Sequence, residues 1–265
     1  MLDTRKVKII LRKEWAEVFK NKMVIFTIIF LPLLFSALPL IMLGATGNTG
    51  VDEISSELPP QFSQMCPEGL TGGECFQVYL ASQFMLLFMM IPLIIPVNIA
   101  AYSIVGEKTT RSLEPLLATP VTTAELLVGK NLASVIPAIV GTWLGFLVFA
   151  VGAAIMVNNP IVISALLEPT WLLAIFLIGP LLAVLSVNFS LMVSSRVNDP
   201  RVAEQVSAVI IVPVLGLFFG QISGLFLINR NIILIMAVVL FAIDAGVLFL
   251  AVRLFQRETI LTRWK

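Results

Sequence analysis

The 265-residue sequence contains no histidine and only two cysteines. Histidine is the commonest metal ligand and the side chain best suited to acid–base chemistry near neutral pH, and two cysteines are too few for a zinc site. The composition therefore argues against a metal or haem centre. We expect no catalytic residue, no metal site and no cofactor on this chain, and hence no enzymatic activity of its own.

Charge is also scarce. Charged residues make up 12% of the chain and hydrophobic residues 58%, with a mean hydropathy of +1.01. Soluble domains carry roughly a quarter charged residues. A chain of this composition would expose too much apolar surface in water, so its solvent must be lipid. We predict an all-α polytopic membrane protein, with residues 1–265 forming one membrane domain.

Six apolar runs are long enough to cross a bilayer as helices, which takes about 20 residues each. We predict spans at Met23–Leu43, Val78–Val105, Asn131–Val157, Trp171–Val193, Glu204–Ile228 and Asn231–Val252. Of the 17 lysines and arginines, all except Arg230 flank these spans on one side. Basic flanks mark the cytoplasmic side. Both termini and the segment Gly106–Lys130 are therefore predicted to lie in the cytoplasm.

The first predicted outer loop, Gly44–Gln77, contains five acidic residues and no basic one. It also contains both cysteines, Cys66 and Cys75, on the oxidising side of the membrane. A disulfide between them is the favoured interpretation, and two free thiols are the alternative.

Residues 4–20 precede the first span and are rich in lysine and arginine. Apolar side chains recur there on one helical face, which Glu14 borders: Val7, Ile10, Leu11, Trp15 and Val18. This pattern is typical of a helix that lies in the membrane interface. A basic flank that only sets the topology is the alternative.

The segment Gly106–Lys130 is polar between two apolar runs, and its two halves indicate short helices. Thr122 and Glu125 have the spacing of a capping box, which predicts a helix start at about Thr123. Continued to about Val157, that helix would be ~50 Å long at 1.5 Å per residue and would project beyond the hydrocarbon core. A second short helix is predicted over Glu107–Ala118.

This segment also resembles a known family. The residues Gly106-Glu107, Leu113-Glu114-Pro115-Leu116-Leu117-Ala118-Thr119-Pro120-Val121, Glu125-Leu126 and Gly129-Lys130 are similar to the cytoplasmic loop of type-2 ABC transporter permeases. The six spans and the basic N-terminal helix fit the same family. The resemblance departs at Asn229–Asn231, a short turn where relatives carry re-entrant helices, and part of Gly220–Arg230 could be such an element.

The resemblance implies a coupling helix that docks on a separate ATPase subunit, which would bind ATP and magnesium, and a dimer of identical or different permeases. Gly129-Lys130 lacks the other residues of a phosphate-binding loop, so this chain does not itself bind ATP in that way. The candidates for the docking surface are Glu107, Arg111, Glu114, Pro115 and Glu125. Ordinary solvated helix charge is the alternative for each of them.

Inside the predicted spans, Asp244 is a carboxylate near the middle of the last one. It is a candidate for the translocation path, with a structural hydrogen bond as the alternative.

Small residues repeat every four positions at Gly216, Gly220 and Gly224, and again at Gly141 and Gly145. This spacing allows close helix approach, either in a dimer seam or within one chain.

The leading hypothesis is the membrane subunit of an ATP-driven exporter that works by alternating access. One alternative is an ATP-independent secondary transporter or channel that uses Asp244. Another is a membrane scaffold whose cytoplasmic loop recruits a soluble protein.

Overall fold

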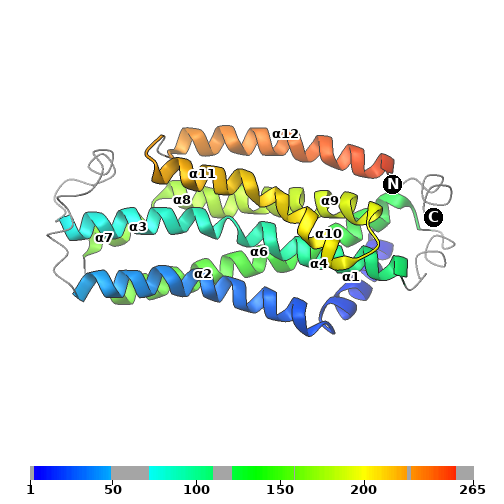
Figure 1. Cartoon of the computed structure of the whole chain (residues 1–265), viewed down its shortest axis with the longest axis horizontal. Coiled ribbons are helices and arrows are strands. Elements are labelled where there is room, and N and C mark those ends of the chain that lie inside the picture. The colour runs from blue at the N-terminus through cyan, green and yellow to red at the C-terminus, as the bar shows by residue number, and fades with distance from the viewer. Residues whose placement is uncertain (1–2, 49–71, 110–120, 158, 226–227, 255–265) are drawn as a thin grey trace.

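The computed structural model describes residues 3–48, 72–109, 121–157, 159–225 and 228–254. Within these ranges the chain forms helices and no strand. The helices run along one long axis, except for the first, which lies across one end of the bundle (Figure 1). They are α1 (Thr4–Val18), α2 (Lys22–Asn48), α3 (Gly72–Phe88), α4 (Ile91–Thr109), α6 (Thr123–Met156), α7 (Pro160–Leu166), α8 (Pro169–Leu173), η3 (Ala174–Ile178), α9 (Gly179–Arg196), α10 (Pro200–Ser207), η4 (Ala208–Ile211), α11 (Val212–Ile222) and α12 (Arg230–Leu254).

Six helical segments among the described residues are long and apolar enough to cross a membrane, which confirms the predicted all-α polytopic fold. Three of them are single helices, namely α2, α6 and α12. The other three are composite: α3 with α4, α7 and α8 with η3 and α9, and α10 with η4 and α11. The short helix α7 lies where the sequence predicted only a connection.

Each composite span is irregular just before a proline. The chain turns at Met89–Met90, two residues before Pro92, η3 is a π-helical turn before Pro180, and the 3₁₀ turn η4 precedes Pro213. Proline removes a backbone donor and its ring collides with the preceding turn, so the regular ladder is interrupted there. In contrast, α2 continues through Pro32 and Pro39, and α6 through Pro137.

Some helix ends differ from the predicted span boundaries. α2 continues to Asn48 and α3 begins at Gly72, so both helices extend into the predicted outer loop Gly44–Gln77. The fifth span ends at Ile222 and not at Ile228. Gly224, with φ 71°, ends this helix. The N–H of Gly224 donates to the carbonyl of Gln221, and the N–H of Leu225 donates to the carbonyl of Gly220. This is a Schellman cap, which needs a residue with positive φ.

The centre of the bundle is α4, which packs against α9 and α6. On the outside, α2 lies against α6, and α12 lies against α9. Large apolar side chains on α2 and α12 face outward, as expected for surfaces in contact with lipid. The C-terminal end of α4, the start of α6 and α1 meet at one end of the bundle, the end to which α12 also runs (Figure 1).

Candidate functional site

A cluster of charged side chains lies where α1 crosses the ends of α4 and α6. Its centre is Lys130 on α6, whose side chain is 3% exposed. Glu14 on α1 and Glu107 on α4 are equally buried, at 2% and 4%. Burying three charged side chains away from water lowers the stability of the fold unless each charge is paired with an opposite one. The distances between their charged groups show whether they are paired.

The Lys130 ammonium group contacts three side chains. It donates to Oε1 of Glu14 at 2.9 Å and to Oγ of Ser103 on α4 at 2.7 Å, and it forms an ion pair with Oε2 of Glu107 at 2.8 Å. The Ser103 hydroxyl in turn donates to Oε2 of Glu14 at 2.6 Å. The Lys130 cluster therefore joins α1, α4 and α6 through one shared cation.

Lys13 adds a second cation at the rim of this cluster and is partly exposed. Its ammonium group contacts Glu107 and lies 3.3 Å from Glu14 and 3.4 Å from Glu17. Carboxylate oxygens of Glu14, Glu17 and Glu107 lie within 4.8 Å of one another, a spacing that could hold a metal ion. Here the ammonium groups of Lys13 and Lys130 supply the neutralising positive charge.

The surroundings shift the pKa values of the two α1 residues in opposite directions. Burial favours the neutral form of Glu14, but Lys130 and Lys13 outweigh it and hold the pKa of the carboxyl below its usual value. Burial also opposes charge on Lys13, but Glu14 and Glu107 raise its pKa above the usual lysine value. The stability from Glu14 is thus present above its unfolded pKa and is lost as the pH falls through its lower folded pKa.

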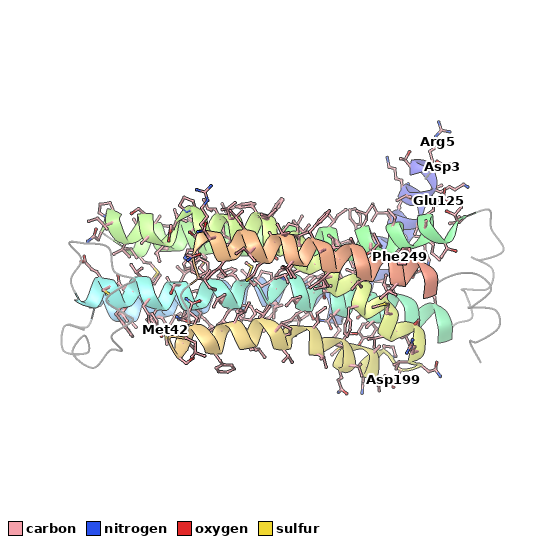
Figure 2. All side chains as sticks on the ribbon, turned by 90° about the horizontal axis from the view of Figure 1, so that it is seen from above. Asp3, Arg5, Met42, Glu125, Asp199 and Phe249 are labelled. Atoms are coloured by element: carbon pink, nitrogen blue, oxygen red, sulfur yellow. The ribbon has the colours of Figure 1, made fainter. Side chains whose placement is uncertain are left out.

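A second set of contacts holds α1 against the first turns of α6. The capping box predicted for Thr122 and Glu125 is confirmed: the Glu125 N–H donates to the Thr122 hydroxyl at 3.2 Å, and the Thr122 N–H donates to Glu125 at 2.8 Å. The Glu125 carboxylate also accepts from the N–H of Asp3 at 3.0 Å and lies 3.8 Å from Lys6. Asp3 and Glu125 lie together at this end of the bundle in Figure 2.

Close packing completes the contact between α1 and α6. A Cβ added to Gly129 would lie 2.6 Å from Cγ2 of Ile10, so only glycine fits at this position without movement. The Trp15 indole N–H donates to the carbonyl of Ala133 at 3.1 Å. Through these contacts α1 and the start of α6 are packed as one rigid unit.

Two of the five predicted docking residues lie where α1 contacts α4 and α6. Glu107 belongs to the Lys130 cluster and Glu125 caps α6, and both are buried. The other three, Arg111, Glu114 and Pro115, lie outside the described residues. Sequence reasoning missed Lys130, Ser103 and Lys13. The available signal was an acid beside the apolar face of α1 and a lysine at the edge of an apolar span.

A comparison with known families identifies the family of this chain. The profile described as ABC-2 family transporter protein matches residues 8–233, which include most of α1 and all of the spans except most of α12. This chain belongs to the ABC-2 transporter family. A search of the curated proteins found no significant match. The sequence-based resemblance to type-2 ABC transporter permeases is therefore confirmed.

The permease contains a further buried acid, Asp244, near the middle of α12. It is 6% exposed, and neither of its carboxylate oxygens has a hydrogen-bond partner among the described residues. Ile233, Ala237 and Ala251 are buried on the same face of α12, which packs against α8, η3 and α9. The acid therefore faces the interior of the permease.

The two sets of glycines spaced four residues apart, one on α6 and one at α11, lie in different surroundings. Gly141 and Gly145 on α6 lie against α2, where a Cβ on Gly145 would lie 3.0 Å from Cβ of Pro32. They therefore serve packing within one chain. An added Cβ on Gly216 meets nothing within 4 Å, and Gly224 lies in the turn that ends α11. The predicted stripe Gly216, Gly220, Gly224 is thus not continuous along one helix, which corrects that part of the prediction.

The predicted disulfide is only partly within the described residues. Cys75 in the first turn of α3 takes part in a disulfide, whereas Cys66, the other cysteine of the permease, lies outside the described residues.

Proposed function

We propose that this permease is the membrane subunit of an ATP-driven exporter, with ATP and magnesium bound by a separate ATPase subunit. The segment between α4 and α6 is the proposed docking site of that subunit. ATP binding and hydrolysis there would move the spans between inward-facing and outward-facing forms. Both termini and this segment would lie in the cytoplasm, and the working unit would contain two permeases.

The Lys130 cluster is the observation that carries the proposal. It joins the last turns of α4 to the first turns of α6, so both flanks of the proposed docking segment are tied together and to α1. Because α4 also packs along α9, a displacement at this end is passed to the centre of the bundle. Packed elements transmit such displacements better than flexible connections do.

This arrangement divides the five candidate residues into two groups. Arg111, Glu114 and Pro115 are the proposed contacts with the ATPase. Glu107 and Glu125 are buried against lysine, threonine and backbone groups, and we assign them the transmission of the movement into α4 and α6.

The test uses the permease reconstituted with its ATPase in proteoliposomes. Glu114→Lys, combined with Arg111→Glu, should weaken ATPase binding and uncouple hydrolysis from transport. Lys130→Gln should leave ATPase binding intact but lower transport, because the cation that α1, α4 and α6 share is then lost. Glu57→Lys in the predicted outer loop is the matched charge reversal and should change neither. Undiminished coupling in the docking variant would contradict the proposal.

A second candidate function is ATP-independent transport in which Asp244 binds an ion or proton. The unpartnered carboxylate favours it. It requires transport by proteoliposomes that contain this chain alone, and transport that appears only with an ATPase and ATP would exclude it.

A further inference from the structure

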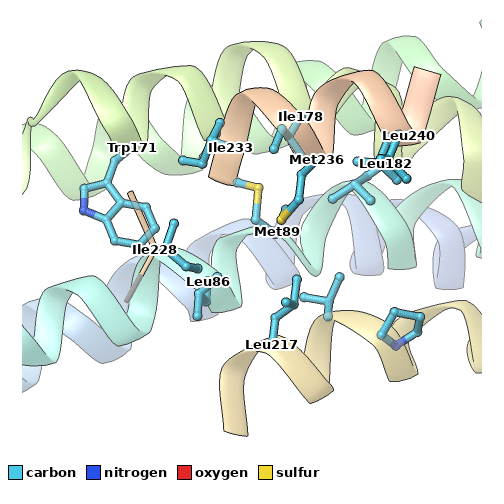
Figure 3. Close-up of a pocket in the computed structure, with 14 residues that line it drawn as sticks. Leu86, Met89, Trp171, Ile178, Leu182, Leu217, Ile228, Ile233, Met236 and Leu240 are labelled. Carbon is cyan, nitrogen blue, oxygen red and sulfur yellow. The ribbon is translucent and has the colours of Figure 1, made fainter. Parts of the chain in front are cut away.

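A cavity of about 280 Å³ lies between α3, the fourth span, α11 and α12. Figure 3 shows side chains from all four elements pointing into it, among them Leu86, Trp171, Leu217 and Met236. All of its lining residues are apolar. A cavity of this kind does not hold ordered water, and it binds hydrocarbon. The π-helical turn η3 contributes Ala174 and Ile178 to its wall, and such turns are frequent at functional sites.

The cavity adjoins the lipid-facing surface of the permease. On one side α11 packs against α3, and on the other α12 packs against α8, η3 and α9. Val239 lines the cavity and is half exposed, and the neighbouring Val238 is 71% exposed. An apolar molecule dissolved in the bilayer can therefore reach the cavity between α11 and α12 without crossing water.

One helical turn from the cavity lies the carboxylate of Asp244. Leu240 lines the cavity, and Asp244 follows it by four residues, about 6 Å along the same face of α12. The acid is buried within a single chain and has no hydrogen-bond partner among the described residues. A carboxylate at this depth favours a cation or a proton as its partner.

We propose that the cavity and Asp244 together form a binding site for hydrophobic amines, with the hydrocarbon body in the cavity and the protonated amino group beside the carboxylate. One part of this inference rests on the proposed function, namely that hydrophobic amines are the molecules the permease transports. Binding itself requires neither ATP nor an ATPase. The two halves of the site select for two properties, since the cavity accepts an apolar body and Asp244 favours positive charge.

The test is photolabelling of the full chain in phosphatidylcholine nanodiscs without ATPase. The probes are dodecylamine, dodecanol and dodecanoate, each with a diazirine at the end of the alkyl chain. The amine probe should label peptides that contain Met89, Leu217 or Met236, and excess unlabelled dodecylamine should suppress this labelling. Asp244→Asn should raise the half-saturating concentration at least about tenfold, whereas Asp244→Glu should retain binding.

Met236→Trp fills the cavity and should abolish the labelling without altering the acid. Val238→Trp places the same side chain on the lipid-facing side of α12 and should leave the labelling unchanged. Equal labelling by all three probes and by Asp244→Asn would overturn the selection for amines. Labelling that excess amine does not suppress, at lipid-facing residues alone, would overturn the site. If amine binding is intact but no ATP-driven transport occurs, the proposed function fails and this inference stands.

Discussion

Two of the buried acidic sites in the described part of this permease are opposites in how their charge is satisfied. Glu14 and Glu107 lie at the end of the bundle and accept from Lys130, Ser103 and Lys13. Asp244 lies at mid-span, equally enclosed, and has no partner among the described residues. Burial alone therefore does not distinguish a structural charge from a functional one.

The paired Lys130 cluster and the unpaired Asp244 are suited to different roles. A paired cluster holds three helices in one geometry and gains little from any further ligand. An unpartnered carboxylate is costly in the same environment and is retained only where something else compensates for it. We therefore assign transmission of movement to the Lys130 cluster and ligand binding to Asp244.

The largest expected effect is that of breaking the paired site. Lys130→Met leaves Glu14 and Glu107 buried without their shared cation and should lower the free energy of unfolding by about 3–5 kcal/mol. The measurement is reversible unfolding in mixed micelles, followed by circular dichroism. Lys8→Met removes an exposed lysine from α1 and is the control, with an expected change near zero. Equal effects of the two substitutions would show that the cluster does not stabilise the contact between the helices.

The opposite sign is expected at the unpaired site. A carboxylate at the centre of a span costs about 2.5–3.5 kcal/mol on insertion scales, so Asp244→Leu should stabilise the permease by up to about 3 kcal/mol. The same variant should lose amine binding, because leucine has no carboxylate to pair with the protonated amino group. A gain in stability together with a loss of binding is typical of a functional site. The measurement is again unfolding in mixed micelles, together with photolabelling. A loss of stability would mean that Asp244 is paired and would remove the contrast between the two sites.

Sequence patterns predicted the features that are local in the chain. The capping box joins residues three apart, Thr122 and Glu125, and its consequence, a helix that starts at Thr123, is observed. The spans follow from runs of apolar residues, and their number is confirmed. The irregular turns in three spans lie just before prolines, but the prolines of α2 and α6 leave their helices continuous, so packing decides which proline interrupts a helix.

The Lys130 cluster could not be predicted in this way, because Glu14 and Lys130 are 116 residues apart and no local rule relates them. Without that contact, Glu107 was interpreted as an exposed docking residue, although it is buried in the structure. Likewise, the spacing of Gly216, Gly220 and Gly224 suggested one stripe, but the helix ends before the third glycine. The cavity beside α12 depends on how four spans pack, which no single segment encodes.

The smallest of the expected effects concerns the contact that brings α1 to the paired site. Gly129→Ala places a Cβ 2.6 Å from Cγ2 and 2.9 Å from Cβ of Ile10, a β-branched side chain with little rotamer freedom. Overpacking of this kind costs about 1–3 kcal/mol. Ile10→Ala removes the obstructing atoms, so the double variant should recover part of the loss, and a double-mutant cycle of unfolding measures the coupling. Gly216→Ala is the control, since its added Cβ meets nothing within 4 Å. If Gly129→Ala proves as harmless as this control, α1 does not lie tightly against α6, and the Lys130 cluster loses the contact that positions Glu14.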